Sequence, residues 1–182
     1  QGIATVSSGA LAQRGGTTSA QVRKDLSFFG SFGKRGLGYA VPELARKLRE
    51  ILGLGHRYNV VVVGAGKIGS ALVQYRGFPK RGFDISAIFD VDPAKIGRRW
   101  NGLIVQDVAS LESGLSTGGV DIAVLVTPAE VAQELAERLV ALGIKAILNF
   151  APVQLNVAEE VAVKNVNLAL ELEALSYALQ NR

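Results

Sequence analysis

A run of β-branched residues that ends in a glycine-rich loop constrains this chain more than any other feature. The stretch NVVVVGAGKIGSALVQY begins at Asn59. Its four consecutive valines predict a strand that is buried on both faces, as in a parallel sheet. The spacing Gly64-x-Gly66-x-x-Gly69 follows directly and opens a helical pattern. Strand, tight glycine turn and helix in this order indicate one half of a dinucleotide-binding unit.

Each glycine of this loop has a separate physical task. Gly64 permits the tight turn, Gly66 lets the backbone approach a pyrophosphate, and Gly69 lets the helix pack closely on the strand. The helix N-terminus then faces the phosphates. We therefore assign the whole loop, including Ala65, Lys67 and Ile68, to cofactor binding. The alternative is a tight strand–helix turn that binds no ligand.

A carboxylate at the expected distance supports the nucleotide interpretation. Asp90 ends the strand pattern FDISAIFD, 21 positions after the last glycine of the loop. There it can accept hydrogen bonds from the ribose hydroxyls, and it would repel a 2′-phosphate, so NAD(H) is preferred to NADP(H). Lys95, Arg98 and Arg99 follow, and such side chains can hold a 2′-phosphate. Because Asp92 adds a second negative charge, we interpret them as a solvated basic loop.

Strand and helix patterns alternate through the rest of the chain. Further strands are expected at 83–90, 103–105, 121–126, 145–150 and 161–166, with a helix at 128–142 between the fourth and fifth strands. This alternation predicts an α/β fold, a doubly wound parallel Rossmann sheet. Ligand contacts then come from the carboxyl ends of later strands, although ordinary strand termination would look the same. The expected contacts are Thr127, Pro128, Asn149, Phe150, Ala151 and Pro152.

The N-terminal third has a different texture and charge. Residues 1–57 carry nine Lys or Arg and three acidic residues, whereas the remainder is mildly acidic. Two short helical patterns separated by a glycine turn have the layout of a helix-turn-helix, whose second helix reads base edges. That helix supplies Gln21, Arg23, Lys24 and Ser27, and the following glycine-rich hairpin supplies Lys34, Arg35 and Gly36 as a cationic wing. A solvated basic surface and a protein-contact module are the alternatives.

The composition excludes several kinds of chemistry. Cysteine is absent and His56 is the single histidine, so thiol chemistry, thiolate metal sites and a metal cofactor are not expected. The sequence has no long apolar run and no leader pattern, which predicts a cytoplasmic protein without a membrane partner. Nor does an acid or base stand in a recognisable catalytic spacing, which argues against an enzyme. Because the chain begins at Gln1, we expect an upstream segment.

Taken together, these motifs resemble the Rex family of bacterial redox-sensing transcriptional repressors. The resemblance covers nearly the whole chain and rests on SAQVRKDLSFFGSFGKRGLGY (19–39), VVGAGKIGSAL (62–72), FDVDPAKIG (89–97) and GIKAILNFAPVQL (143–155). It implies a winged-helix domain at 1–53 lacking its first helix, a linker at 54–57, an NAD(H)-binding Rossmann domain at 58–165 and a swapped dimerisation helix at 166–182. It also implies a homodimer that binds palindromic operator DNA and releases it when NADH binds.

The resemblance adds two residues to the expected site. Tyr75 matches a tyrosine that changes orientation with cofactor state, and Tyr177 matches an aromatic position on the swapped helix near the partner's nicotinamide. Two rival functions stay open. One is a small NAD-dependent oxidoreductase with a helical appendage, and the other is a nucleotide-binding adaptor whose N-terminal module contacts protein.

Overall fold

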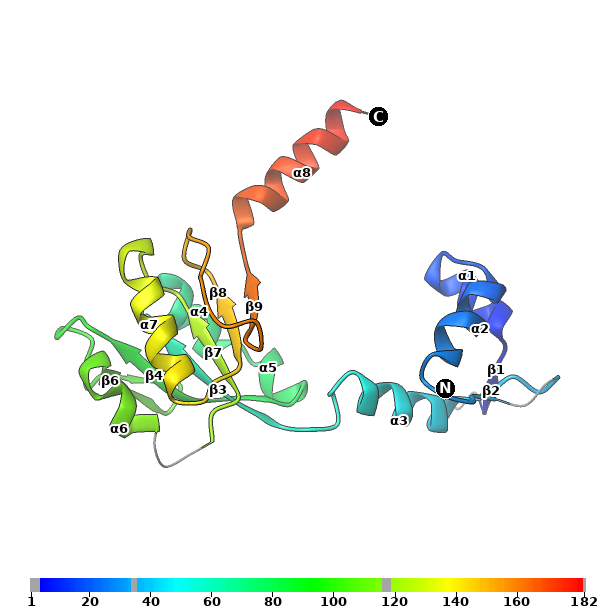
Figure 1. The fold of residues 1–182 in the computed structure, drawn as a ribbon, viewed down its shortest axis with the longest axis horizontal. Helices are drawn as coiled ribbons and strands as arrows, with labels where there is room; N and C mark the ends of the chain where they lie inside the picture. Colours follow the sequence, from blue (N-terminus) through cyan, green and yellow to red (C-terminus); the bar gives the residue numbers. More distant parts are fainter. Residues whose placement is uncertain (1–3, 34–35, 116–118, 182) are drawn as a thin grey trace. The chain divides into compact units, whose positions relative to one another are not determined.

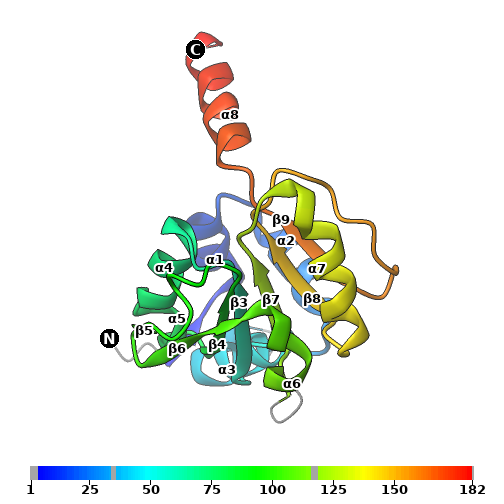
Figure 2. The same ribbon diagram turned by 90° about the vertical axis from the view of Figure 1, so that its left-hand side faces the viewer.

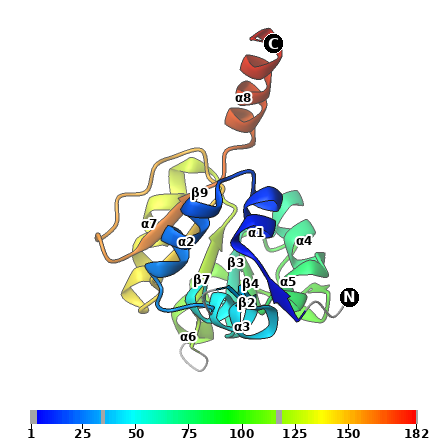
Figure 3. The same cartoon turned by 90° about the vertical axis from the view of Figure 1, so that its right-hand side faces the viewer.

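The computed structural model describes residues 4–33, 36–115 and 119–181 and divides into two compact units, Gln1–His56 and Arg57–Arg182. In the first unit two short helices pack against one another (Figure 3). Helix α1, Ser8–Gly15, is capped by Ser7, whose hydroxyl accepts from the Ala10 N–H, and it ends at the left-handed Gly16. Helix α2, Ser19–Ser27, is capped by Thr18, whose hydroxyl accepts from the Gln21 N–H.

A short antiparallel ladder completes the first unit in a way that the sequence did not indicate. Strand β1, Thr5–Val6, pairs with β2, Tyr39–Ala40, and β2 leads into helix α3, Val41–Ile51. The apolar spacing of Val22, Leu26 and Phe29 predicts one buried face on α2. Val22 and Leu26 are half-buried, but the prediction is wrong for Phe29, which is 54% exposed after the helix ends at Ser27. The expected cationic tip at Lys34 and Arg35 lies outside the described residues.

The second unit contains a seven-stranded sheet in the order β5-β6-β4-β3-β7-β8-β9 (Figure 1). All neighbouring strands are parallel except the edge pair β5–β6. Without β5, this is the Rossmann order 3-2-1-4-5-6, so the predicted fold class is confirmed. The strands are β3 Tyr58–Val63, β4 Phe83–Asp90, β5 Arg99–Trp100, β6 Leu103–Asp107, β7 Ile122–Leu125, β8 Ala146–Asn149 and β9 Ala162–Asn165.

Helices cover the two faces of this sheet unequally (Figure 2). On one face lie α6, Leu111–Leu115, and α7, Ala129–Ala141, with a 3₁₀ turn at Val108–Ser110. On the other face lie α4, Lys67–Gln74, and the single turn α5, Gly77–Lys80. Figure 2 shows α6 and α7 across the sheet from α4 and α5. The first face therefore holds the larger core.

The spacing of Val131, Leu135, Leu139 and Leu142 predicts one buried face on α7, and the structure departs from it at Val131. Val131 was expected inside but is 41% exposed, whereas Ala132 and Ala136 are fully buried beside Leu135 and Leu139. The small alanines thus complete the buried face of α7. The prediction is therefore confirmed at Leu135 and Leu139 and wrong at Val131.

Part of the α4 face is left open. An apolar groove of about 410 Å³ crosses strands β3, β4, β7, β8 and β9, with Val60, Ile85, Ile122 and Leu148 among its walls and Lys164 at its border. The chain between β8 and β9 crosses without a helix, and α8, Leu168–Gln180, projects away from the sheet (Figure 1). Every residue of α8 is exposed, including five leucines and Tyr177.

The turn from β3 into α4 depends on one close approach. A Cβ on Gly69 would overlap the carbonyl oxygen of Gly64, which belongs to the backbone and cannot rotate away. A Cβ on Gly66 would meet no atom of the protein within 4 Å. The fold itself therefore requires glycine at 69 but does not require it at 66.

We expect Gly69→Ala to lower the melting temperature by at least about 4 °C, because forced overpacking costs about 1–3 kcal/mol. The matched variant Gly66→Ala should melt within about 1 °C of the wild type, since its new methyl group meets nothing. Differential scanning calorimetry of both purified variants measures the difference. Equal melting temperatures for the two variants would show that the close approach is not a packing constraint.

Candidate functional site

The glycine loop lies at the point where the strand order of the sheet reverses, between β3 and β7. In open α/β sheets, ligands bind at this switch point outside the carboxyl ends of the strands. Gly64 adopts a φ of 107°, and a Cβ there would overlap the carbonyl oxygen of Val126, the residue that directly follows the neighbouring strand β7. The loop therefore crosses directly over the end of β7. Helix α4 begins directly after the loop without a side-chain cap, and the first N–H groups of a helix have no partner within it, as an anion site requires.

Within the loop, Gly66 is the glycine whose missing side chain packing does not explain. It precedes the first residue of α4 with an ordinary extended backbone, and the space beside its Cα is open. An alanine would fit there in the protein alone. Open space above a helix N-terminus is what a pyrophosphate needs for close contact with the backbone.

Asp90, at the carboxyl end of β4, is 7% exposed and thoroughly hydrogen-bonded. One carboxylate oxygen, Oδ2, accepts from the Ala65 N–H at 2.6 Å, and Oδ1 accepts from the Asp92 N–H at 2.8 Å. The Lys95 ammonium donates to both oxygens, at 3.4 Å to Oδ1 and 3.2 Å to Oδ2. The carboxylate thus ties the glycine loop to the end of β4.

These contacts fix the charge of Asp90. Burial in itself acts to raise the pKa of its carboxyl, but hydrogen bonds from the N–H groups of Asp92 and Ala65 and from Lys95 outweigh that effect. The pKa therefore lies below its ordinary value, and the group is a carboxylate at neutral pH. Arg98 and Arg99 are exposed, as expected of a solvated basic loop, but Lys95 is half-buried and pairs with both Asp90 and Asp92.

Thr127 and Pro128 follow β7 at the same edge of the sheet. The Thr127 hydroxyl oxygen is buried and, among the described residues, has no hydrogen-bond partner. A buried hydroxyl without a partner costs about 1–3 kcal/mol, which a ligand atom at this edge can recover. Pro128 caps α7 without a side-chain bond, so the N-terminus of a second helix faces the switch point.

Asn149, at the end of β8, uses its amide within the protein. It is fully buried, its Nδ2 donates to the Val153 carbonyl at 2.8 Å and to Asn165 Oδ1 at 2.9 Å, and its Oδ1 accepts from the Ala151 N–H at 2.9 Å. The structure therefore places Asn149 as the residue that shapes the turn after β8. Its expected contact with the nucleotide stays a prediction.

The turn that Asn149 shapes forms one wall of a cavity of about 590 Å³. Ile68 from the glycine loop, Phe150 and Pro152 from the turn, and Leu168 from the start of α8 all line it. The structure thus brings together the loop and the residues after β8. Tyr75 and Tyr177 do not line this cavity. Tyr75 is 58% exposed and contacts Phe78 edge-on, with ring centroids 4.9 Å apart, while Tyr177 is 71% exposed on α8.

The expected nucleic-acid residues of α2 divide between two faces. Gln21 and Lys24 lie three residues apart and share one exposed face. Arg23 points elsewhere, and its guanidinium donates to the Ser8 hydroxyl of α1 at 3.0 Å. Gln21 also donates to Asp25 at 2.6 Å, and the Ser27 hydroxyl donates to the Lys24 carbonyl. Gly36 has a φ of 87°, a turn conformation that suits a wing.

Metal sites and membrane-spanning helices were also sought in the described parts of the chain. No group of three His, Cys, Asp or Glu side chains gathers there as a metal ion would need. Across residues 4–33, 36–115 and 119–181, every helix is too short or too polar to cross a membrane.

Comparison with known proteins matches both units. Residues 56–153 match the family described as CoA binding domain, and residues 1–27 match a putative DNA-binding protein N-terminus. A "Redox-sensing transcriptional repressor Rex" from Carboxydothermus hydrogenoformans is 50% identical over 99% of this chain and 86% of its own. The relative of that name from Thermus thermophilus is 49% identical over the full chain and 85% of its own.

Solved structures agree with these relatives. The crystal structure of RSP in complex with β-NAD⁺ and operator DNA is 40% identical, covers 99% of this chain and 83% of its own, and superposes with a TM-score of 0.94. RSP in complex with β-NADH gives a TM-score of 0.85 at 39% identity over 98% of this chain and 84% of its own. With half of its residues identical across nearly its whole length, this chain belongs to the Rex family of redox-sensing transcriptional repressors.

Proposed function

We propose that this protein is a transcriptional repressor that binds palindromic operator DNA through its first unit and NAD(H) through its second. The observation that supports NAD(H) binding is the open space beside Gly66. This space lies at a helix N-terminus, and packing within the protein does not require a glycine there. The pyrophosphate then lies on the loop 64–69, with Lys67 beside it. Asp90 holds the adenosine ribose, and the Thr127 hydroxyl meets the ligand at the end of β7.

The cofactor acts as a signal in this proposal and is not turned over. The relatives are named as repressors, and RSP has been solved with NAD⁺ together with operator DNA and with NADH. A regulator is therefore favoured over the small oxidoreductase, and the operator complex counts against the adaptor. By linkage, NADH must bind the DNA-incompetent arrangement more tightly than the competent one, and DNA must weaken NADH binding by the same factor. A repressor of bacterial genes works in the cytoplasm.

Gln21 and Lys24 are the base-reading pair in this proposal, since they share the exposed face of α2. Lysine suits guanine O6 and N7, and glutamine suits adenine. Arg23 is held toward α1 by Ser8, which suits a contact with the DNA backbone. The wing with Lys34, Arg35 and Gly36 reaches an adjacent minor groove, where an A·T-rich flank focuses negative potential.

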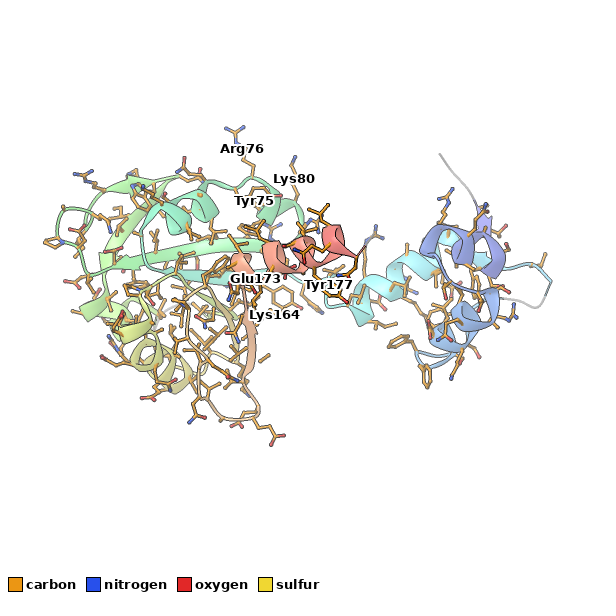
Figure 4. The ribbon with its side chains drawn as sticks, turned by 90° about the horizontal axis from the view of Figure 1, so that it is seen from above. Tyr75, Arg76, Lys80, Lys164, Glu173 and Tyr177 are labelled. Carbon is orange, nitrogen blue, oxygen red and sulfur yellow. The ribbon has the colours of Figure 1, made fainter. Side chains whose placement is uncertain are left out.

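The homodimer is proposed from the open groove and from α8. A helix of 13 residues is marginal in water, and this one is apolar on most sides, so it needs a protein surface. We assign the groove over β3, β7 and β8 to the α8 of a second copy. The charges agree, because α8 carries Glu171 and Glu173 and no basic residue, while Lys164 lines the groove and Arg76 and Lys80 lie on the α4–α5 segment (Figure 4).

We expect Gly66→Ala to abolish measurable NADH binding, because the methyl group takes the space of the pyrophosphate, while its melting temperature stays that of the wild type. Operator binding should survive but no longer respond to NADH. Isothermal titration with NADH and a fluorescence-anisotropy operator titration provide the two readouts. NADH affinity within threefold of the wild type would contradict the pyrophosphate assignment.

We expect Lys24→Ala to weaken operator binding by about 1–3 kcal/mol and to reduce the preference for operator over random DNA, as loss of a base contact does. Arg14→Ala is the matched control, since Arg14 carries the same charge at the end of α1. It should weaken both DNAs equally and slightly. If Lys24→Ala also weakens both DNAs equally, Lys24 contacts the backbone and reads no base.

The double variant Leu172→Asp, Leu175→Asp would bury two unpaired carboxylates, and we expect it to sediment as a monomer with reduced operator affinity. The control Leu172→Met, Leu175→Met keeps apolar volume and should remain a dimer. Analytical ultracentrifugation measures both. A stable dimer of the aspartate variant that still releases DNA on adding NADH would refute the exchange of α8.

A further inference from the structure

The ammonium of Lys95 occupies the open side of the Asp90 carboxylate. A carboxylate offers about four acceptor positions, two on each oxygen. The Asp92 N–H takes one position on Oδ1, and the Ala65 N–H takes one on Oδ2. Lys95 donates to the remaining position of each oxygen. No acceptor position of Asp90 is then left for a ribose hydroxyl.

Of the three groups that donate to Asp90, two are fixed in the backbone and one is a side chain that can move away. The Ala65 and Asp92 N–H groups belong to the backbone of the glycine loop and of the β4 end. The Lys95 side chain is 32% exposed, and its contacts at 3.2–3.4 Å are longer than the backbone bonds. A ribose diol that binds Asp90 must therefore take the two positions that Lys95 holds.

The segment that carries Lys95 is anchored, so only the side chain needs to turn. The Lys95 and Ile96 N–H groups donate to the Asp92 carbonyl, and the Gly97 N–H donates to the Val105 carbonyl of β6. Asp92 Oδ1 also accepts from the Ala94 N–H. The same ammonium lies 3.5 Å from the Asp92 carboxylate, a second negative charge that can retain it near the ribose position when it turns away from Asp90.

We propose that Lys95 sets the selectivity of this site between a 2′-hydroxyl and a 2′-phosphate on the adenosine ribose. The inference rests on the proposed NAD(H) function. A dinucleotide with a free 2′-hydroxyl displaces Lys95 from Asp90 and loses that ion pair. A 2′-phosphorylated dinucleotide is repelled by Asp90 but gains the displaced ammonium as a partner. Lys95 thus weakens the binding of the dinucleotide with a free 2′-hydroxyl and strengthens the binding of the 2′-phosphorylated one. It therefore reduces the difference between the two affinities.

The variant Lys95→Met tests this, since it keeps the length of the side chain and removes the charge. Direct titration of the full-length protein with NADH and NADPH gives a dissociation constant for each. We expect the ratio of the NADPH constant to the NADH constant to rise at least tenfold. The conservative variant Lys95→Arg retains a cation over Asp90 and should stay within threefold of the wild-type ratio.

Arg99→Met is the matched control for general charge. Arg99 lies four residues further on in β5 and donates to the Gly102 carbonyl, away from Asp90. Its loss removes the same positive charge from the neighbourhood and should weaken both dinucleotides by a similar factor. A ratio in Lys95→Met that changes no more than in Arg99→Met would overturn the inference. A wild-type protein that binds neither dinucleotide would instead overturn the proposed function, and this inference with it.

Discussion

The close contact between the first turn of α4 and the end of β3 determines where everything else in the second unit lies. Because Gly69 has no side chain, the helix can sit directly on the Gly64 carbonyl. The helix N-terminus is thereby held at the switch point, facing outward beside the ends of β4 and β7. Asp90 reaches back to the Ala65 N–H of the same loop. The loop is therefore fixed from both sides before any ligand arrives.

Two polar groups lie beside that fixed loop at the same edge of the sheet, one without a hydrogen-bond partner and one held in part by a side chain. The Thr127 hydroxyl lacks a partner among the described residues, and the Asp90 carboxylate is held by a lysine that solvent can reach. Preorganisation of this kind reduces the ordering cost of binding. A ribose that binds Asp90 would compete with the protein's own Lys95 ammonium for the same carboxylate.

The sequence predicted those parts of the fold that local patterns determine. The four valines, the glycine spacing and the placement of Asp90 gave the central strands, the loop and the fold class. The antiparallel pair β1–β2 was not predictable, since two residues per strand carry no periodic signal. Val131 was misplaced because small alanines decided how α7 packs. Nothing in the spacing of Asn149 showed that its amide would be consumed by Ala151, Val153 and Asn165.

Lys95 shows why charge patterns alone mislead. Two acidic residues nearby suggested a solvated loop, yet those two carboxylates are what draw the ammonium inward. Such a pairing depends on the turn at 92–97, which no short motif encodes. Sequence motifs did not predict the groove beside α4 either. It is uncovered because the connection between β8 and β9 contains no helix.

The second unit contains both an exposed apolar helix, α8, and an open apolar groove, and each of these surfaces needs an apolar partner. A chain that kept both exposed would present a large apolar surface to water, which soluble monomers rarely do. If α8 folded back onto its own groove, nucleotide state would stay within one subunit. The proposed exchange between copies would make the contact isologous, and an isologous dimer matches the two-fold symmetry of a palindromic operator. Leu168 lines the cavity beside the glycine loop and also begins α8, so a ligand in that cavity touches the first turn of the helix that would join the two copies.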